Sequence, residues 1–124
     1  MKCPACREIM FVAEYNRIEL DLCPVCHGVW FDADELRLLL DDAAPLDVAP
    51  ASTDESPRKC PTCRERMDKM NIGPGRRVLI DACPAGCGLF FDDKETAELT
   101  RDLEEGGWQL KPEIRDFLYE MFPE

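Results

Sequence analysis

The sequence predicts a small, metal-stabilised α+β fold in which one module occurs twice and a C-terminal helix follows. Three observations support this prediction: eight cysteines in close pairs, a repeat with a period of about 60 residues, and alternating apolar residues between the cysteine pairs. The chain has 124 residues, which is room for one domain or two very small ones. A module of about 40 residues rarely folds on its apolar core alone, and a bound metal often supplies the difference.

The cysteines form two groups of four, and a proline follows the first cysteine of every pair. Because no secretion signal opens the sequence, close cysteine pairs favour metal binding over disulfides. Four thiolates complete a closed tetrahedral zinc site. We therefore predict two zinc ions, one bound by Cys3, Cys6, Cys23 and Cys26, and the other by Cys60, Cys63, Cys83 and Cys87.

The repeat continues beyond the cysteines. The segment 29–32, Val-Trp-Phe-Asp, matches the segment 89–92, Leu-Phe-Phe-Asp. In both copies the aspartate is followed three residues later by a glutamate, Glu35 or Glu95, which is typical of a capping box at a helix start. Each module is therefore expected to end in a short helix.

Each module also contains a predicted β-hairpin between its cysteine pairs. In the first copy, apolar residues over 9–12 and 18–22 flank Tyr15-Asn16, and the second run alternates with acidic residues. In the second copy, 67–72 and 77–82 flank Gly73-Pro74-Gly75, a strong turn signal.

The predicted domain boundaries follow from the composition between these elements. Residues 45–57 are rich in Ala, Pro, Asp and Ser, bury little apolar surface and are predicted to form a flexible linker. Module 1 then covers residues 1–44 and module 2 covers residues 58–105.

Residues 106–124 are predicted to form an amphipathic C-terminal helix. One apolar stripe runs along it, made of Ile114, Phe117, Leu118, Met121 and Phe122. The helix either folds back over a small core or binds another chain, and self-association through residues 108–122 is one form of the second possibility.

The second cysteine pair of module 2 differs from its counterpart, because three residues rather than two separate Cys83 from Cys87. Counting back from the shared Phe-Asp aligns Cys87 with His27 and Gly86 with Cys26. Either this loop is remodelled, or His27 replaces Cys26 as a ligand. Four thiolates at the usual spacing favour Cys26.

The charge balance constrains the partners. Fifteen Lys and Arg against 26 Asp and Glu give a net charge of −11, which argues against non-specific nucleic-acid or anionic-membrane binding. Eight thiolates and two zinc ions would bring the charge to about −15. No apolar run approaches the length of a transmembrane helix, and we expect a cytoplasmic protein.

These residues resemble a known family. Cys3-Pro4-Ala5-Cys6, a hairpin, and then Cys23 to Asp32 (Cys-Pro-Val-Cys-His-Gly-Val-Trp-Phe-Asp) are similar to the bacterial TFIIB-type zinc-ribbon domain over residues 1–41. Residues 58–101 repeat the pattern more loosely, with Phe90 in place of Trp30. The resemblance implies two tandem zinc ribbons, each with one structural zinc ion.

The predicted function is non-catalytic protein binding. The sequence contains no serine–histidine pair or phosphate loop, and a zinc ion with four thiolates has no open position for water. By analogy with ribbons in transcription proteins, RNA polymerase or an accessory factor is the suggested partner. The alternatives are a rubredoxin-like iron site that transfers electrons and thiol–disulfide chemistry at one cysteine pair.

Overall fold

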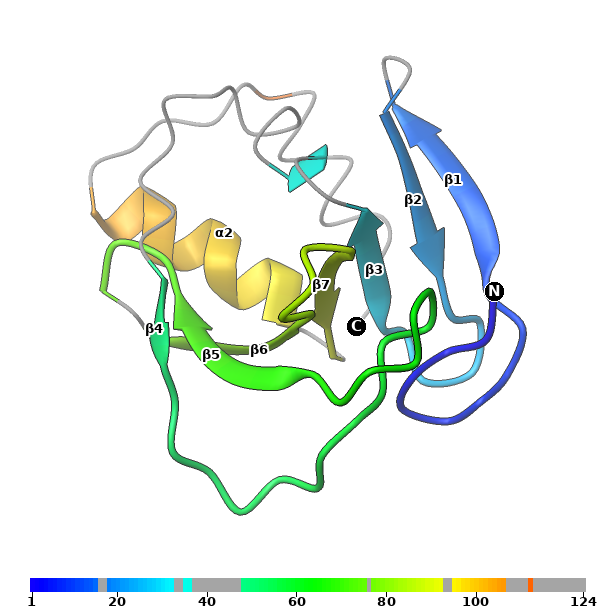
Figure 1. Cartoon of the computed structure of the whole chain (residues 1–124). Coiled ribbons are helices and arrows are strands. Elements are labelled where there is room, and N and C mark those ends of the chain that lie inside the picture. Colours follow the sequence, from blue (N-terminus) through cyan, green and yellow to red (C-terminus); the bar gives the residue numbers. More distant parts are fainter. Residues whose placement is uncertain are drawn as a thin grey trace.

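The computed structural model describes residues 1–15, 18–32, 35–36, 48–75, 77–92, 95–106 and 112. They form one antiparallel sheet of seven strands in the order β1-β2-β3-β7-β6-β5-β4, with one helix, α2, beside it (Figure 1). The strands are β1 (Phe11–Tyr15), β2 (Ile18–Leu22), β3 (Val29–Asp32), β4 (Val48–Pro50), β5 (Asp68–Ile72), β6 (Val78–Ala82) and β7 (Gly88–Phe91), and α2 spans Glu95–Glu105. Both predicted hairpins are present, as β1–β2 and β5–β6.

The two modules meet at the centre of the sheet, where β3 pairs with β7. Trp30 lies opposite Phe90, and the neighbouring pairs follow in antiparallel register. Because Trp30 and Phe90 are equivalent positions of the repeat, the modules are related by an approximate twofold axis between these two residues. The contact is therefore of the isologous kind seen in symmetric dimers, here within one chain.

The two faces of the sheet carry different cores, as the alternation of side chains along a strand requires. Phe31 and Phe91 meet edge-on, with ring centroids 5.3 Å apart, on the face that α2 covers. That core contains Leu20, Leu22, Val29, Phe31, Leu36, Ile72, Val78, Ile80, Phe91, Leu99 and Leu103. The opposite face carries a smaller core of Trp30, Phe90, Met10, Met67, Cys3, Cys23, Cys60 and Cys83. Both cysteine groups therefore lie on one side of the sheet.

The helix of module 2 begins where the capping pattern predicts. The Glu95 carboxylate accepts a hydrogen bond from the backbone N–H of Asp92, and the Glu95 N–H donates to the Asp92 carbonyl at 3.1 Å. Gly106 then donates to the Asp102 carbonyl and closes the last turn. Of the corresponding helix in module 1, the structure describes Glu35 and Leu36, both helical.

The predicted C-terminal helix over residues 106–124 lies outside the described residues, apart from Gly106 and Pro112. Within the described parts of the chain, no helix is long and apolar enough to cross a bilayer.

The structure differs from the prediction of a flexible linker over residues 45–57. Residues 48–50 form β4 and pair with β5, and the Ala51 N–H donates to the Lys69 carbonyl at 3.0 Å. Glu55 then forms an ion pair with Lys69 at 2.6 Å. Backbone pairing and charge, rather than apolar burial, hold this segment, so its composition gave no sign of order.

Candidate metal centres

The cysteine pairs of module 1 lie in tight backbone turns. The Arg7 N–H donates to the Cys3 carbonyl at 2.8 Å, and the His27 N–H donates to the Cys23 carbonyl at 3.1 Å. Arg7 and His27 adopt left-handed φ angles of 67° and 64°, which turn the chain immediately after each second cysteine. Each turn points two sulfur atoms to the same side.

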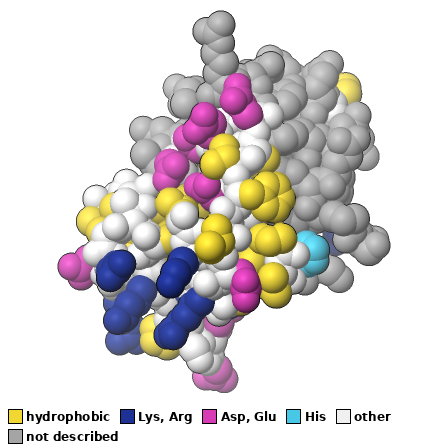
Figure 2. Space-filling view, turned by 90° about the vertical axis from the view of Figure 1, so that its right-hand side faces the viewer, with side chains coloured by type: hydrophobic (Ala, Val, Ile, Leu, Met, Phe, Trp, Pro, Cys, Tyr) yellow, Lys and Arg dark blue, Asp and Glu magenta, His cyan; other side chains and the backbone are white. Residues whose placement is uncertain are grey.

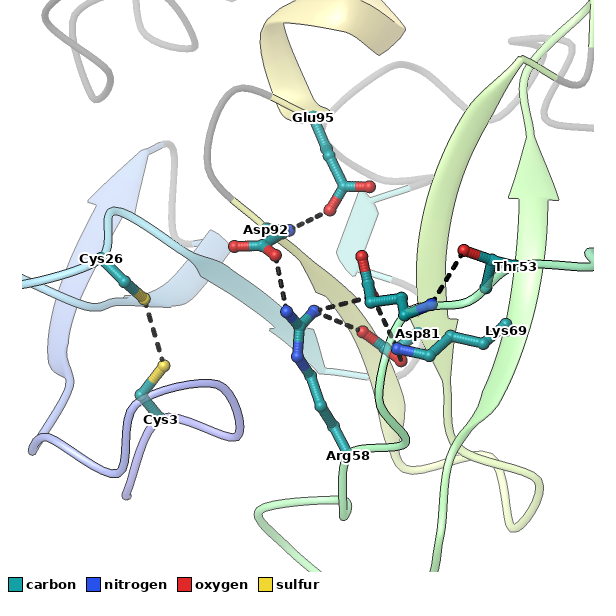
Figure 3. Close-up of polar contacts among 9 residues, drawn as sticks. Cys3, Cys26, Thr53, Arg58, Lys69, Asp81, Asp92 and Glu95 are labelled. Carbon is teal, nitrogen blue, oxygen red and sulfur yellow. Dashed lines mark hydrogen bonds and ion pairs between the residues drawn. The ribbon is translucent and has the colours of Figure 1, made fainter.

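The four sulfur atoms of module 1 lie within 4.8 Å of one another. Cys6 Sγ is 3.3 Å from Cys23 Sγ, and Cys3 Sγ is 3.5 Å from Cys26 Sγ, the pair drawn in Figure 3. A zinc–sulfur distance of about 2.3 Å in a tetrahedron separates the sulfurs by about 3.8 Å, so this group fits one zinc ion. Cys26 belongs to the group, and His27 is not part of it among the described residues.

Module 2 gathers its four cysteines by a remodelled loop. Cys60, Cys63, Cys83 and Cys87 again lie within 4.8 Å of one another, with Cys63 Sγ 3.5 Å from Cys83 Sγ. Here the left-handed residue is Gly86, with φ of 82°, and its N–H donates to the Cys83 carbonyl at 3.0 Å. The turn therefore comes one residue earlier than at His27, and Cys87 follows it. The two groups together fit two zinc ions.

The two groups share an electrostatic feature. Burial raises the pKa of Cys23, but N–H groups of Cys26 and Val25 donate to its sulfur and lower its pKa to about 7. Burial acts likewise on Cys83, and the N–H groups of Cys87 and Ala85 bring its pKa to about 7 as well. Without metal, each group thus contains one readily ionised thiol. The remaining thiols release their protons when zinc binds.

An ion-pair network lies beside the second group. Arg58 donates to Asp81 Oδ2 at 3.0 Å and to Asp92 Oδ2 at 2.7 Å, and its guanidinium lies 5.6 Å from the centroid of the Phe90 ring. Lys69 Nζ approaches Asp81 Oδ1 at 2.6 Å. Figure 3 shows Arg58 between the two carboxylates. Asp81, only 1% exposed, is therefore balanced by two cations.

In module 1 the equivalent aspartates, Asp32 and Asp21, have different partners. The indole Nε1 of Trp30 donates to Asp32 Oδ1 at 2.6 Å. This hydrogen bond stands where module 2 has the contact between Arg58 and Asp92. Asp21, the counterpart of Asp81, forms no ion pair with a Lys or Arg side chain among the described residues. Burial raises the pKa of Asp21, and the charge of Asp32 raises it further, while the Met1 ammonium lowers it.

A basic groove lies between the first cysteine pairs of the two modules. It has a volume of about 800 Å³, and the same positions of both modules line it, Lys2 and Arg7 in one and Lys59 and Arg64 in the other. No Asp or Glu lines it. Figure 2 shows a cluster of Lys and Arg side chains on this side of the molecule. These cations lie next to cysteines that would carry a net charge of −2 per zinc site.

The network around Asp81 is not among the features that the sequence predicts. One signal was present: an aspartate precedes the second cysteine pair by two residues in both modules, Asp21 and Asp81, and in module 2 the rest of that strand is apolar. Its partners Arg58 and Lys69 come from positions 23 and 12 residues away, which no local pattern marks.

A comparison with family models agrees with this geometry. Residues 2–42 match the family Zn_ribbon_TFIIB, described as a transcription factor zinc-finger. The first module therefore matches a TFIIB-type zinc ribbon. The second cysteine group, with the pairing of β3 and β7, fits a duplicated copy of that ribbon. Comparisons with curated proteins and with solved structures gave no significant match.

Proposed function

We propose that this chain is a non-catalytic zinc protein that binds a protein partner through its paired ribbons. All eight cysteines act as ligands, four for each zinc ion. The closed arrangement of four sulfurs carries this proposal, because a zinc ion bound in this way has no position for a substrate or an activated water. The metals would then stabilise a surface rather than perform a reaction.

The paired ribbons favour a rigid binding surface. Trp30 and Phe90 are fully buried in the small core that contains cysteines of both groups, so each site supports the other. Large apolar side chains are exposed on module 1, among them Ile9, Phe11 and Val12. Figure 2 shows hydrophobic side chains gathered on the side of the molecule where β1 lies. Such exposed groups are typical of protein-binding surfaces.

The family description suggests the partner class. A transcription factor zinc-finger that lacks a catalytic site is suited to contact RNA polymerase or an accessory factor, and this analogy is the basis for proposing them.

A second candidate function is nucleic-acid binding. One observation favours it, the basic groove lined by Lys2, Arg7, Lys59 and Arg64. It offers positive charge to a nucleic acid in spite of the net charge of −11. A titration with fluorescent single-stranded DNA at several salt concentrations distinguishes the two. We expect the zinc-loaded chain not to bind the DNA at physiological salt, because the groove cations offset the charge of the zinc–thiolate sites. Binding that weakens steeply as the salt concentration rises would instead favour nucleic-acid binding as the function.

The experiment for protein binding uses the tagged, zinc-loaded chain as bait in extract of the native host. Its matched control carries Phe11→Ser and Val12→Ser, two exposed positions at which the substitutions leave the buried cores intact. We expect a partner that the wild type retains and the control loses, and that binds again when both proteins are purified. Retention of no protein beyond a tag-only control would contradict the proposal.

A further inference from the structure

The basic groove is built from equivalent residues of the two modules. Residues 2–8 read Lys-Cys-Pro-Ala-Cys-Arg-Glu, and residues 59–65 read Lys-Cys-Pro-Thr-Cys-Arg-Glu. Exposed positions that follow differ between the copies, Ile9 against Arg66 and Phe11 against Asp68. The cations that line the groove are therefore the same in both copies, whereas neighbouring exposed positions have changed.

Arg7 and Arg64 occupy a backbone conformation that does not favour arginine. Their φ angles are 67° and 66°, in the left-handed region, where a side chain is costly and glycine is not. Both residues are exposed, so packing in a core does not explain them. Strained residues of this kind are typical of ligand-binding positions. The presence of arginine in both copies indicates a role for the side chain itself.

The groove cations are available to a ligand. No ion pair within the described part of the chain involves any of the four, Lys2, Arg7, Lys59 and Arg64. The cysteines that line the groove, Cys3 and Cys60, are each 1% exposed, so a ligand meets the cations rather than the sulfurs. A volume of about 800 Å³ holds a short segment of chain rather than a folded domain.

We propose that this groove binds a short acidic segment of the partner protein, whose carboxylates pair with Arg7 and Arg64 and with the adjacent lysines. The inference rests on the proposed function and specifies the partner's chemistry. Arginine fits this role because its planar guanidinium donates two parallel hydrogen bonds to one carboxylate. Ile9 lines the groove on the module 1 side and is 71% exposed, so it offers a contact to an apolar residue within the segment.

Two features favour an acidic peptide over a nucleic acid. Among the described residues that line the groove there is no aromatic side chain on which a base could stack. Glu8 and Glu65 follow the two arginines and do not line the groove, and the chain as a whole carries a charge of −11. A long polyanion extends past the groove and meets this negative charge, whereas a segment of a few residues does not.

The probe is a fluorescein-labelled octapeptide made of Asp and Glu around one central Leu. It is titrated with the zinc-loaded full chain, and binding is followed by fluorescence anisotropy. We expect saturable binding that weakens as the salt concentration rises. An octapeptide with Asn and Gln in place of the acids should bind about tenfold more weakly, because neutral acceptors form weaker hydrogen bonds to arginine than carboxylates do.

The double variant with Arg7→Gly and Arg64→Gly should also bind the acidic peptide about tenfold more weakly. Because glycine favours the left-handed backbone at both positions, its folding equilibrium constant and its zinc content should not fall. Arg66→Gln is the matched control for Arg64→Gly, since it removes the same charge outside the groove lining. Arg66→Gln should bind the peptide as the wild type does, whereas Arg64→Gly alone should bind it several-fold more weakly.

The same titrations contain the results that would overturn the inference. Equal binding of the peptide to the wild type and the double variant, or no binding at millimolar peptide, would do so. Single-stranded DNA that displaces the peptide at a lower concentration than unlabelled peptide does would assign the groove to a nucleic acid. A wild-type dimer in sedimentation, absent from the double variant, would assign it to a second copy of this chain.

The double variant separates this inference from the broader proposal. If a purified partner binds the double variant as tightly as it binds the wild type, the groove is not its contact, while protein binding by the ribbons stands. If no partner binds the wild type at all, it is the proposed function that fails.

Discussion

The two modules place aspartates at the same positions of the same fold but provide different partners for them. In module 2, Arg58 and Lys69 balance Asp81, and Arg58 also contacts Asp92. In module 1, the indole of Trp30 takes over the contact with Asp32, and Asp21 has no Lys or Arg partner among the described residues. Asp81 is fully buried inside an ion-pair network, whereas Asp21 is only partly buried, so the burial of this equivalent carboxylate differs together with the cations that surround it.

The modules also differ in the loop before their last cysteine. Cys26 follows Cys23 at the usual spacing and precedes the left-handed His27, whereas Cys87 comes after the left-handed Gly86. Both sets of sulfurs nevertheless lie within the same 4.8 Å limit. A zinc site therefore constrains where the sulfurs lie and leaves the path of the backbone between them free to vary.

Replacement of the paired aspartates should give the largest difference between the modules. Asp81→Ala leaves Arg58 and Lys69 without their shared carboxylate, and removal of one partner of a buried ion pair costs about 3 kcal/mol. Asp21→Ala removes a carboxylate that no such cation balances, so its effect should stay within about 1 kcal/mol. Urea unfolding of both zinc-loaded variants measures this, and equal losses would contradict the comparison.

Glycines at the module interface should give the next largest effects. A methyl group at Gly88 would meet the Phe31 backbone oxygen and the Trp30 ring, whereas one at Gly28 would meet the end of the Phe90 ring. A backbone atom can move aside less easily than the end of a ring. Gly88→Ala should therefore lower the free energy of unfolding by about 2–3 kcal/mol and Gly28→Ala by about 1–2 kcal/mol. Thermal unfolding with zinc content checked in parallel tests the order; a larger loss for Gly28→Ala would reverse it.

The capping glutamate of α2 should make stability depend on pH. Burial, followed by the charges of Asp92 and Glu55, raises the pKa of Glu95 from 4.5 to about 8. The folded chain therefore binds this proton more tightly than the unfolded chain, and stability falls as pH rises from about 4.5 through 8.

Between about pH 6 and pH 8 we expect the wild type to lose about 1–2 kcal/mol more than Glu95→Gln, which cannot ionise. Zinc remains bound in this range, whereas stronger acid protonates the thiolates. Urea unfolding at several pH values measures the difference. Parallel stability curves for the two proteins would refute the role of Glu95.

The smallest effect is expected at His27. Its φ of 64° is costly for a residue with a side chain, so His27→Gly should stabilise the chain by about 0.5–1 kcal/mol with unchanged zinc content. Gly86→Ala is the counterpart in module 2, where φ is 82°, and should destabilise by a similar amount. Loss of zinc from His27→Gly would instead identify the imidazole as a ligand.

Local patterns predicted those parts of the molecule that local chemistry determines. Paired cysteines, the turn at Gly73-Pro74-Gly75 and the glutamate three residues after Asp92 each act over a few residues, so spacing alone located the sulfur groups, a hairpin and a helix start. Equivalence of Trp30 and Phe90 was also visible in the repeat.

Contacts between the modules could not be predicted in this way. The pairing of β3 with β7 joins residues about 60 positions apart, and nothing in either strand marks the other as its neighbour. Strand β4 is held by backbone pairing to β5 and by the ion pair of Glu55 with Lys69, so its Ala- and Pro-rich sequence resembles a linker. Both features depend on distances that exist only in the folded chain.

The central claim is that two structural zinc sites, one in each ribbon, hold this chain together. Metal analysis with native mass spectrometry on protein purified from its own host tests it most directly. The account predicts a colourless protein with two zinc ions per chain, falling to one when Cys23 or Cys83 is replaced by serine. A chain that carries iron, or that keeps both metal ions after either replacement, would contradict it.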